Sequence, residues 1–247
     1  MGTSKVVLDL TQTWGYYTSF DSKFDNADKN DQTSAAYQNS GAYIFRPSSP
    51  EQKLQEIKPL KARFYNTSVG MEVQIEYEEP WIKTTTRVLT GLPYLEIEYT
   101  VGPIPVGDGR GKEIVTRLSS NIDSSGTFYT DSNGREFMER KRNYRPRWDL
   151  NVYEPVAGNY YPVNAAIYIE DSSGALAVAT DRTQGGSSLL DGSIELMVQR
   201  RTLVDDSRGV AEPMNETDGG ITPCPPFGNA TRLREGVVTL SLTPIHR

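Results

Sequence analysis

The polar side chains best suited to chemistry lie close together late in the sequence. Arg200 and Arg201 are adjacent, the pair Asp205 and Asp206 follows shortly after, and Arg208 comes just beyond them. The preceding residues 194–199 alternate apolar and polar side chains, which predicts a strand with one buried face. Charges held in a loop at the end of a buried strand can form a polar binding site.

Two neighbouring carboxylates could also act as the general acid and the nucleophile of a glycoside hydrolase. Adjacent residues of a strand point to opposite faces, however, so Asp205 and Asp206 are poorly placed to flank one bond. We favour ion pairs between these aspartates and Arg200, Arg201 or Arg208 that shape the loop. The remaining prominent acids alternate with apolar residues and are assigned to solvent-facing sides of strands: Glu72, Glu76, Glu96 and Glu98.

Histidine and cysteine chemistry has little support. The chain has one histidine, His246, so neither a His-based triad nor a site with several histidines for zinc can be built from it. The one cysteine, Cys224, stands between Pro223 and Pro225, which favours an exposed loop and an accessible free thiol. In a secreted protein its disulfide partner would lie outside this sequence.

Charge and hydropathy exclude several classes of partner. The formal net charge is −6 and the pI is about 5.0, and the one basic run, residues 140–142, is interleaved with acids, so we expect no nucleic-acid binding. No stretch approaches the roughly 20 apolar residues of a membrane helix, so no membrane partner is expected.

Three N-glycosylation tripeptides begin at Asn66, Asn215 and Asn229, and they favour a secretory product. The first residues, 1–7, lack the apolar core of a signal peptide. We therefore expect a piece of a longer secretory protein.

Period-2 alternation is the main structural signal. It predicts strands at 71–78, 84–89 and 95–100, separated by turns at roughly ten-residue spacing, which indicates an antiparallel meander. Further predicted strands cover 6–10, 41–46, 113–118, 166–171, 175–180 and 236–240. Asp171–Gly174 and the Asn133-Gly134 pair predict hairpin turns. The polar residues 21–38 predict an exposed loop.

No segment has a sustained helical repeat, so the sequence predicts an all-β fold. The strands are too many for one flat sheet, which favours a large antiparallel β-sandwich of two stacked sheets.

Several motifs resemble one known family. The segments SGAYIFRP at 40–47, GTFYTDSNGREFMERKR at 126–142, NYYPVN at 159–164, DRTQGGSSLLDGSIELMVQRR at 181–201 and DDSRGV at 205–210 occur in the same order in family 38 glycoside hydrolases. The sequence is most similar to the C-terminal β-domain of acid α-mannosidases of the lysosomal and vacuolar type. The resemblance is specific from about residue 40 to 208 and weak outside that range.

This resemblance implies a galactose mutarotase-like super-sandwich that is incomplete at both ends. It divides the chain into an N-terminal strand and polar loop, 1–39, and a β-sandwich domain, 40–247, truncated at its C-terminal end. Family members carry their catalytic aspartates and zinc ligands in a preceding α/β domain. We therefore expect no catalytic residue, no metal ligand and no bound cofactor in this chain, and zinc only in the full-length enzyme.

The resemblance also implies two substrate-binding residues. The tyrosine of the SGAY segment matches Tyr43, and the arginine of the DDSRG segment matches Arg208. Tyr43 would offer its hydroxyl to a sugar or to a zinc-bound carboxylate, and Arg208 a polar contact through its guanidinium group. The competing interpretation is that Tyr43 is a core residue and Arg208 an ion-pair partner of the aspartates.

The function implied is that of a non-catalytic domain of a retaining α-mannosidase that trims mannose from N-glycans in the lysosome or vacuole, or after secretion. An alternative is a free-standing, lectin-like carbohydrate-binding module. It would need aligned exposed aromatic rings, for which the candidates are Trp14, Tyr16, Tyr17, Tyr160 and Tyr161. A third interpretation is a polypeptide with no independent role.

Overall fold

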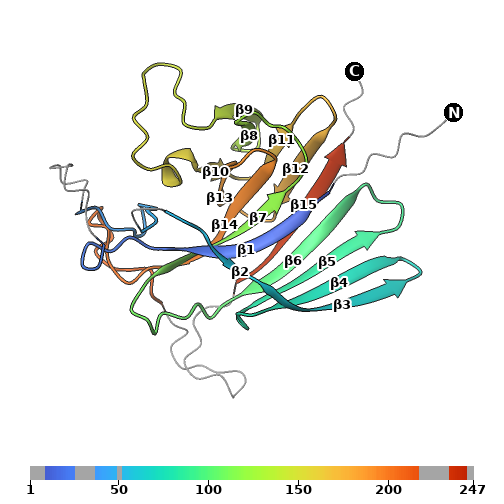
Figure 1. Ribbon diagram of the computed structural model, residues 1–247, viewed down its shortest axis with the longest axis horizontal. Helices are drawn as coiled ribbons and strands as arrows, with labels where there is room; N and C mark the ends of the chain where they lie inside the picture. The colour runs from blue at the N-terminus through green and yellow to red at the C-terminus, as the bar shows by residue number, and fades with distance from the viewer. Residues whose placement is uncertain (1–8, 26–36, 49–51, 217–233, 244–247) are drawn as a thin grey trace.

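The structure is a computed structural model that describes residues 9–25, 37–48, 52–216 and 234–243. Two antiparallel sheets stack face to face, which confirms the predicted all-β sandwich (Figure 1). A 3₁₀ turn, η2, interrupts the strands at Ala157–Asn159. No helix in the described part of the chain has the length and apolar character needed to cross a membrane.

The six-stranded sheet has the order β10-β13-β14-β7-β1-β2. Its strands are β1 (Thr11–Thr18), β2 (Gln55–Ile57), β7 (Lys112–Ser119), β10 (Tyr161–Val163), β13 (Gln184–Ser187) and β14 (Ser193–Arg201). Strand β1, from the N-terminal segment 1–39, lies between β2 and β7 and is therefore part of the sandwich. The division of the chain after residue 39 stays a prediction.

The nine-stranded sheet has the order β3-β4-β5-β6-β15-β12-β11-β8-β9. Its strands are β3 (Pro59–Thr67), β4 (Gly70–Tyr77), β5 (Ile82–Leu89), β6 (Tyr94–Val101), β8 (Thr127–Ser132), β9 (Glu136–Lys141), β11 (Ala166–Glu170), β12 (Ala175–Thr180) and β15 (Arg234–Thr243). Both predicted hairpins are present, as β8–β9 and β11–β12. The turn residues Asn133 and Gly134 have φ of 56° and 70°, the left-handed conformation that an Asn-Gly turn supplies.

The main core lies between the two sheets. Trp14 of β1 meets Tyr99 of β6 edge to face at 5.4 Å, and Gln184 of β13 donates a 2.9 Å hydrogen bond to the Tyr99 hydroxyl. Strand pleating sends Ile194, Leu196 and Val198 of β14 into the same core, as their alternation predicts.

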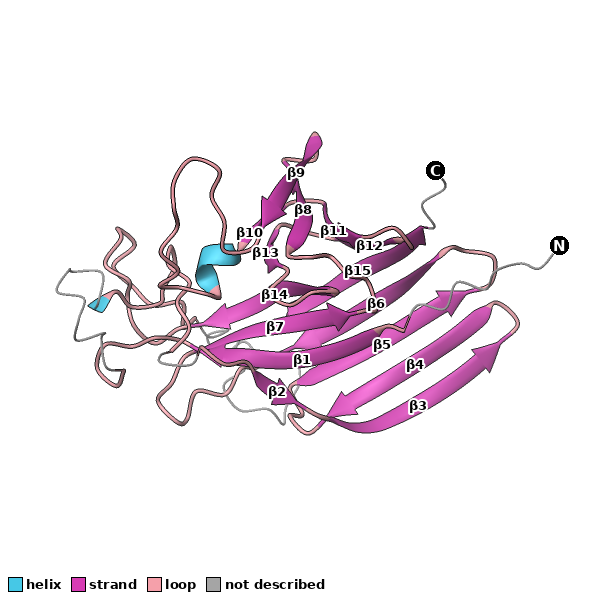
Figure 2. Cartoon of the chain, turned by 45° about the horizontal axis from the view of Figure 1, so that its top comes forward, coloured by secondary structure: helices cyan, strands magenta, loops and turns pink. Residues whose placement is uncertain are grey.

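The outer face of the six-stranded sheet is covered as well, by residues 37–48, 52–54 and 143–160. Tyr17, Val115 and Val156 form a second buried cluster there, against which Phe45 and Tyr160 pack. The sequence prediction of one wet face for β14 is therefore wrong, because long loops fold back over it. The loops gather at the left-hand end in Figure 1, and β3–β6 extend toward the other end (Figures 1 and 2).

The outer face of β4–β6 carries the solvent-exposed charges that alternation predicts. Arg87 bridges Glu72 at 2.9 Å and Glu98 at 2.6 Å, and Arg63 pairs with Glu76 at 2.6 Å. Ion pairs this open to water contribute little to stability, so this face is a solvated surface.

Candidate functional site

The candidate site lies in the loops that follow β1 and β14, beside the start of β7, at the left-hand end of the molecule in Figure 1. The β7–β14 register places Arg200 opposite Glu113, and the guanidinium group donates hydrogen bonds of 3.0 and 2.6 Å to the buried carboxylate. Arg200 also donates to the Ile44 carbonyl at 2.7 Å, and Ser40 donates to Glu113 at 2.6 Å. The strand ends therefore hold the 38–47 loop on the sheet.

Asp206 joins that loop to the 205–210 loop. Its Oδ2 accepts hydrogen bonds from the backbone amides of Tyr43 at 2.6 Å and Ile44 at 3.0 Å. Its Oδ1 accepts the amide of Arg208 at 3.1 Å. Asp206 is only 1% exposed, so these amides replace the water that an ionised carboxylate would otherwise bind.

The expected ion pairs of the two aspartates with arginines are wrong. Asp206 binds backbone amides, Arg200 pairs with Glu113, and Arg201 donates to the side-chain oxygen of Asn215 at 2.7 Å. The aspartate nevertheless shapes the loop, as expected, because a carboxylate can hold several amides at once.

The pKa of Asp206 reflects two opposed effects. Burial of the carboxyl group raises its pKa, but the hydrogen bonds from the amides of Tyr43, Ile44 and Arg208 outweigh burial and lower the pKa below its ordinary value. Asp206 therefore remains ionised in mildly acidic solution, and with its oxygens engaged it is no candidate nucleophile.

Tyr43 does not lie on a strand. The predicted strand at 41–46 is wrong, since this segment is a loop whose one ladder contact is an isolated bridge between Pro47 and Ser19. The amides of Tyr43, Ile44 and Arg46 donate to side chains, and that of Gly41 donates to the Ile44 carbonyl, so none of these bonds is to a neighbouring strand. The Tyr43 side chain is 64% exposed, so the core interpretation is wrong and its hydroxyl is accessible to a ligand.

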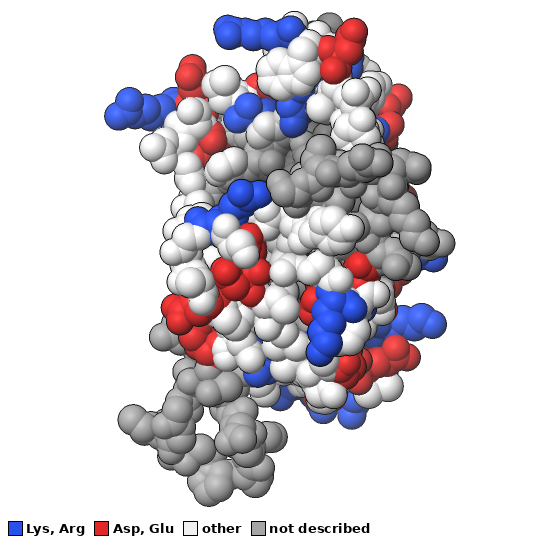
Figure 3. Space-filling view, turned by 90° about the vertical axis from the view of Figure 1, so that its left-hand side faces the viewer, with Lys and Arg blue, Asp and Glu red and all other residues white. Residues whose placement is uncertain are grey.

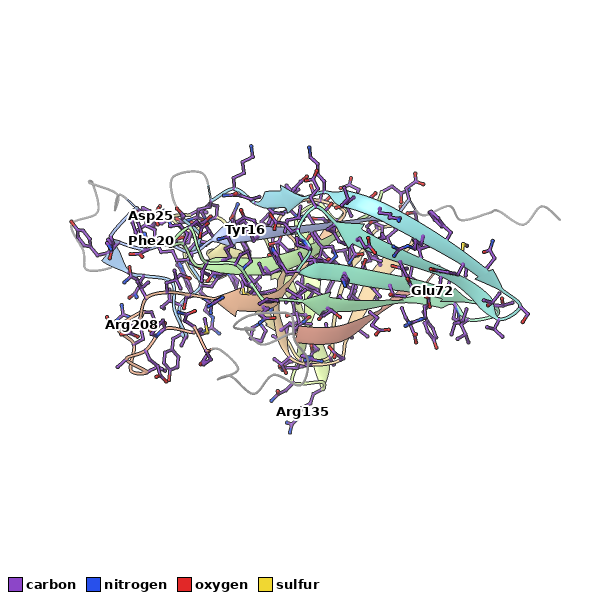
Figure 4. The ribbon with its side chains drawn as sticks, turned by 90° about the horizontal axis from the view of Figure 1, so that it is seen from below. Tyr16, Phe20, Asp25, Glu72, Arg135 and Arg208 are labelled. Atoms are coloured by element: carbon purple, nitrogen blue, oxygen red, sulfur yellow. The ribbon has the colours of Figure 1, made fainter. Side chains whose placement is uncertain are left out.

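Arg208 is also exposed. Its backbone amide binds Asp206, but within the part of the chain that the structure describes its guanidinium group forms no ion pair. Figure 4 shows Arg208 at the loop end of the molecule, opposite the end that bears Glu72. The structure thus brings the backbones of Tyr43 and Arg208 onto one carboxylate and leaves both side chains open to solvent.

A further buried carboxylate lies beneath the loops, and sequence analysis does not identify it. Glu195 of β14 is fully buried and accepts hydrogen bonds from the hydroxyls of Tyr17 and Tyr160 and from Arg117 at 2.6 and 3.0 Å. Burial and then the charge of Glu195 raise the pKa of the Tyr160 hydroxyl well above its ordinary value, so it remains a donor. The sequence signal for this burial is the length of the two loops before β2 and β10, since loops this long can cover a sheet face.

The aromatic residues proposed as a sugar platform do not form one. Trp14 and Tyr17 are buried, and Tyr160 packs against Phe45 with its hydroxyl on Glu195. Half-buried Tyr16 and Tyr161 do not align with them on one exposed face. Exposed aromatic side chains lie instead on the 143–156 loop: Tyr144, Trp148 and Tyr153.

This loop end carries charges of both signs. Figure 3 shows acidic and basic side chains interspersed around uncharged surface, so no large single-sign patch marks a nucleic-acid site on the described part of this face. Among the described residues, no group of three or more His, Cys, Asp or Glu side chains could hold a metal ion. The donors in this part of the chain therefore do not fit a zinc site.

Two predicted glycosylation sites can be placed. Asn66 is exposed on β3, and Asn215 is exposed while its side-chain oxygen accepts the bond from Arg201. Asn229, Cys224 and His246 lie outside the described residues. Glycosylation and the free thiol stay predictions.

Comparisons with known proteins agree on one group. The family described as "Glycosyl hydrolases family 38 C-terminal domain" matches residues 3–208. The lysosomal α-mannosidase of Bos taurus is 52% identical over 190 residues, which cover 74% of this chain and 18% of that protein. Its Homo sapiens counterpart is 48% identical over 216 residues, covering 87% of this chain and 20% of that protein.

A solved structure has the same fold. The crystal structure of an α-mannosidase from Enterococcus faecalis V583 aligns with a TM-score of 0.56 at 14% identity, over 94% of this chain and 25% of that one. The present chain thus spans about a fifth of the length of the curated relatives and a quarter of this structural neighbour.

Proposed function

Because this chain belongs to the glycosyl hydrolase family 38 C-terminal domains, we propose that it is the non-catalytic β-domain of a zinc-dependent, retaining α-mannosidase that removes α-linked mannose from N-glycans. It packs on a catalytic α/β domain and contributes Tyr43 and Arg208 to the sugar-binding pocket. The relatives named lysosomal α-mannosidases support a lysosomal or vacuolar enzyme, with secretion as the other expected location.

One observation carries this proposal above the others. Tyr43 and Arg208, from loops far apart in sequence, emerge together at one end with exposed side chains. The phenol hydroxyl can donate or accept a hydrogen bond, and the guanidinium group donates several, which matches the hydroxyl groups of a sugar.

The exposed aromatic loop supports a docking role for the same end. The 143–156 loop is tied to the Tyr43 loop by the ion pair between Glu154 and Arg46 at 2.8 Å. Trp148 and Tyr153 remain exposed on it. Aromatic residues are enriched at protein interfaces, where they bury large areas at low entropic cost.

Zinc would supply Lewis-acid chemistry and sugar coordination in the catalytic domain. This chain would then act by binding and orienting the sugar and by keeping water out of the pocket mouth. No step of bond cleavage is assigned to it.

The proposal predicts that the isolated chain does not hydrolyse an aryl α-mannoside at acid pH with added zinc. It also predicts no binding of mannose oligosaccharides in calorimetric titration, because half of the pocket is absent. Zinc-dependent turnover above a no-protein blank would contradict the non-catalytic role. Millimolar or tighter binding would instead favour the lectin-like alternative, with Trp148 and Tyr153 as its platform.

A further inference from the structure

Tyr43 and Arg208, the two exposed residues of the proposed site, are both held by the buried carboxylate of Asp206. The Asp206 carboxylate accepts the amide of Tyr43 at 2.6 Å and that of Arg208 at 3.1 Å, on different oxygens. Both residues are thereby fixed at the backbone, directly below the side chains that face solvent. Movement of this carboxylate changes the distance between the phenol and the guanidinium group.

Further contacts hold residues 38–47 against residues 205–210 around Asp206, a contact between two loops that we call the joint. Gln38 donates to the Asp206 carbonyl at 2.6 Å, and Asn39 donates to the Asp205 carbonyl at 3.2 Å. A Cβ on Gly41 would lie 2.7 Å from the Asp206 Cβ, so only glycine permits this close approach of the loops. The two loops therefore have little freedom to slide past each other.

The joint is connected to the sheet. Arg200 of β14 donates hydrogen bonds to two residues of the Tyr43 loop, to the Ser40 hydroxyl at 3.2 Å and to the Ile44 carbonyl at 2.7 Å. Arg200 in turn is held by Glu113 of β7. A rigid pair of strands thus supports the loop that carries Tyr43.

We propose that Asp206 is a positioning residue that fixes Tyr43 and Arg208 at the spacing required to bind one sugar ring. This inference rests on the proposed function, because it assigns a purpose to the site named there. Asp206 does not touch the sugar, since its oxygens are occupied by amides. It also leaves the guanidinium group of Arg208 available to ligand, because it binds only the backbone of that residue.

Asp206→Asn is the sharpest test, because it preserves shape but turns one acceptor into an NH₂ group that would face a backbone donor. The matched control is Asp131→Asn. Asp131 is also a buried carboxylate held by backbone amides, with Oδ2 on Gly134 at 2.7 Å and Oδ1 on Asn164 and Ala165 at 2.8 and 2.9 Å. It lies at the β8–β9 hairpin, away from the proposed site.

The first readout is amide hydrogen exchange in this chain by NMR, which does not depend on activity. We expect Asp206→Asn to speed exchange at Tyr43, Ile44 and Arg208, and Asp131→Asn to leave these amides unchanged. Unchanged exchange in Asp206→Asn would overturn the inference at its structural step.

The second readout is kinetics of the complete α-mannosidase that carries this chain. We expect Asp206→Asn to raise KM and lower kcat/KM by about 10- to 100-fold, since a misplacement of roughly 1 Å costs up to about 100-fold. Asp131→Asn should leave KM unchanged. In a background of Tyr43→Ala with Arg208→Ala, the effect of Asp206→Asn should nearly vanish, because it acts through those residues.

The two levels of failure are distinguishable. If Tyr43→Ala and Arg208→Ala leave kcat/KM unchanged, the proposed function is wrong in its site residues. If they lower it while Asp206→Asn behaves like Asp131→Asn, the positioning inference is wrong. Should Asp206→Asn not fold, Gln38→Ala replaces it, because it loosens the same joint and keeps the carboxylate; an unchanged KM there overturns the inference.

Discussion

Two buried acidic residues each hold a loop in place, and they do so with different kinds of hydrogen-bond donor. Asp206 binds three backbone amides and thereby joins two loops, whereas Glu195 binds two phenols and a guanidinium group and thereby fastens a loop to the sheet. Both carboxylates are almost fully buried. Their cost of desolvation is offset only while every donor stays in place, so each is sensitive to the loss of one partner.

Tyr160→Phe tests this sensitivity at Glu195. The substitution removes one donor from the buried carboxylate and keeps the ring that packs on Phe45. We expect the free energy of unfolding to fall by about 1.5–3 kcal/mol, the range for a hydrogen bond to a charged group. Urea denaturation followed by tryptophan fluorescence measures it.

Tyr153→Phe is the control, because Tyr153 is 77% exposed in a neighbouring loop. It should change the unfolding free energy by less than about 0.5 kcal/mol. Equal effects of the two substitutions would show that the Tyr160 hydroxyl on Glu195 stabilises the fold no more than an exposed hydroxyl does.

The assignment of Tyr43 and Arg208 as substrate-binding residues stays a prediction, and the sequence gives no sign of the contacts that hold them. Tyr43 and Arg208 were identified from a motif resemblance, and alternation cannot reveal that Asp206 accepts their amides. The bonds from the Tyr43 and Ile44 amides span more than 160 residues of chain and depend on how two loops meet. Glu195 was assigned to a wet face because period-2 patterning describes the strand and carries no information about loops that cover it.

Strands with one wet face were the most predictable elements. The alternation of residues 71–78 and 95–100 corresponds to β4 and β6, and the turn residues fixed both hairpins. Strand β1 was missed because its sequence, Thr11–Thr18, does not alternate and is largely covered on both faces. Strand β3 was also overlooked, although the run Leu60 to Phe64 alternates apolar and basic residues.

Large apolar side chains are exposed to solvent along edge strand β3 and its neighbours. Phe64 is 70% exposed, and the register places it across from Val73 of β4, on the apolar face of the nine-stranded sheet. Met71 and Val88 continue this face with substantial exposure. An open edge strand beside exposed apolar side chains favours association with another copy of the chain.

Phe64→Lys tests that expectation in chain produced without glycans, because a glycan on Asn66 would lie on the same face of β3. We expect the unmodified chain to self-associate in sedimentation velocity and Phe64→Lys to shift it toward monomer. The unfolding free energy should change by less than about 1 kcal/mol, since the side chain is already exposed.

Tyr65→Lys is the matched control, because it adds the same charge on the opposite, polar face of β3. It should leave the association unchanged. A chain that is monomeric at tens of micromolar, or an equal response to both substitutions, would contradict the assignment of this face.

The whole molecule has two distinct ends. The loop end holds Tyr43, Arg208 and the aromatic 143–156 loop, fixed by buried carboxylates. The other end holds the extended strands β3–β6 with their charged outer face (Figures 1 and 4). The chain spans about a fifth of the length of its mannosidase relatives. Under the function proposed above, the loop end is the surface that would meet the catalytic domain.

The most direct test of the account is reconstitution of activity. The catalytic portion of a lysosomal α-mannosidase about 50% identical over this region, lacking its own matching segment, would be co-expressed with this chain and assayed with an aryl α-mannoside at acid pH with zinc. The relative's own segment, supplied separately, is the positive control. We expect this chain to restore activity, and Tyr43→Ala with Arg208→Ala to restore much less. Turnover by this chain alone, or no restoration where the relative's segment succeeds, would contradict the account.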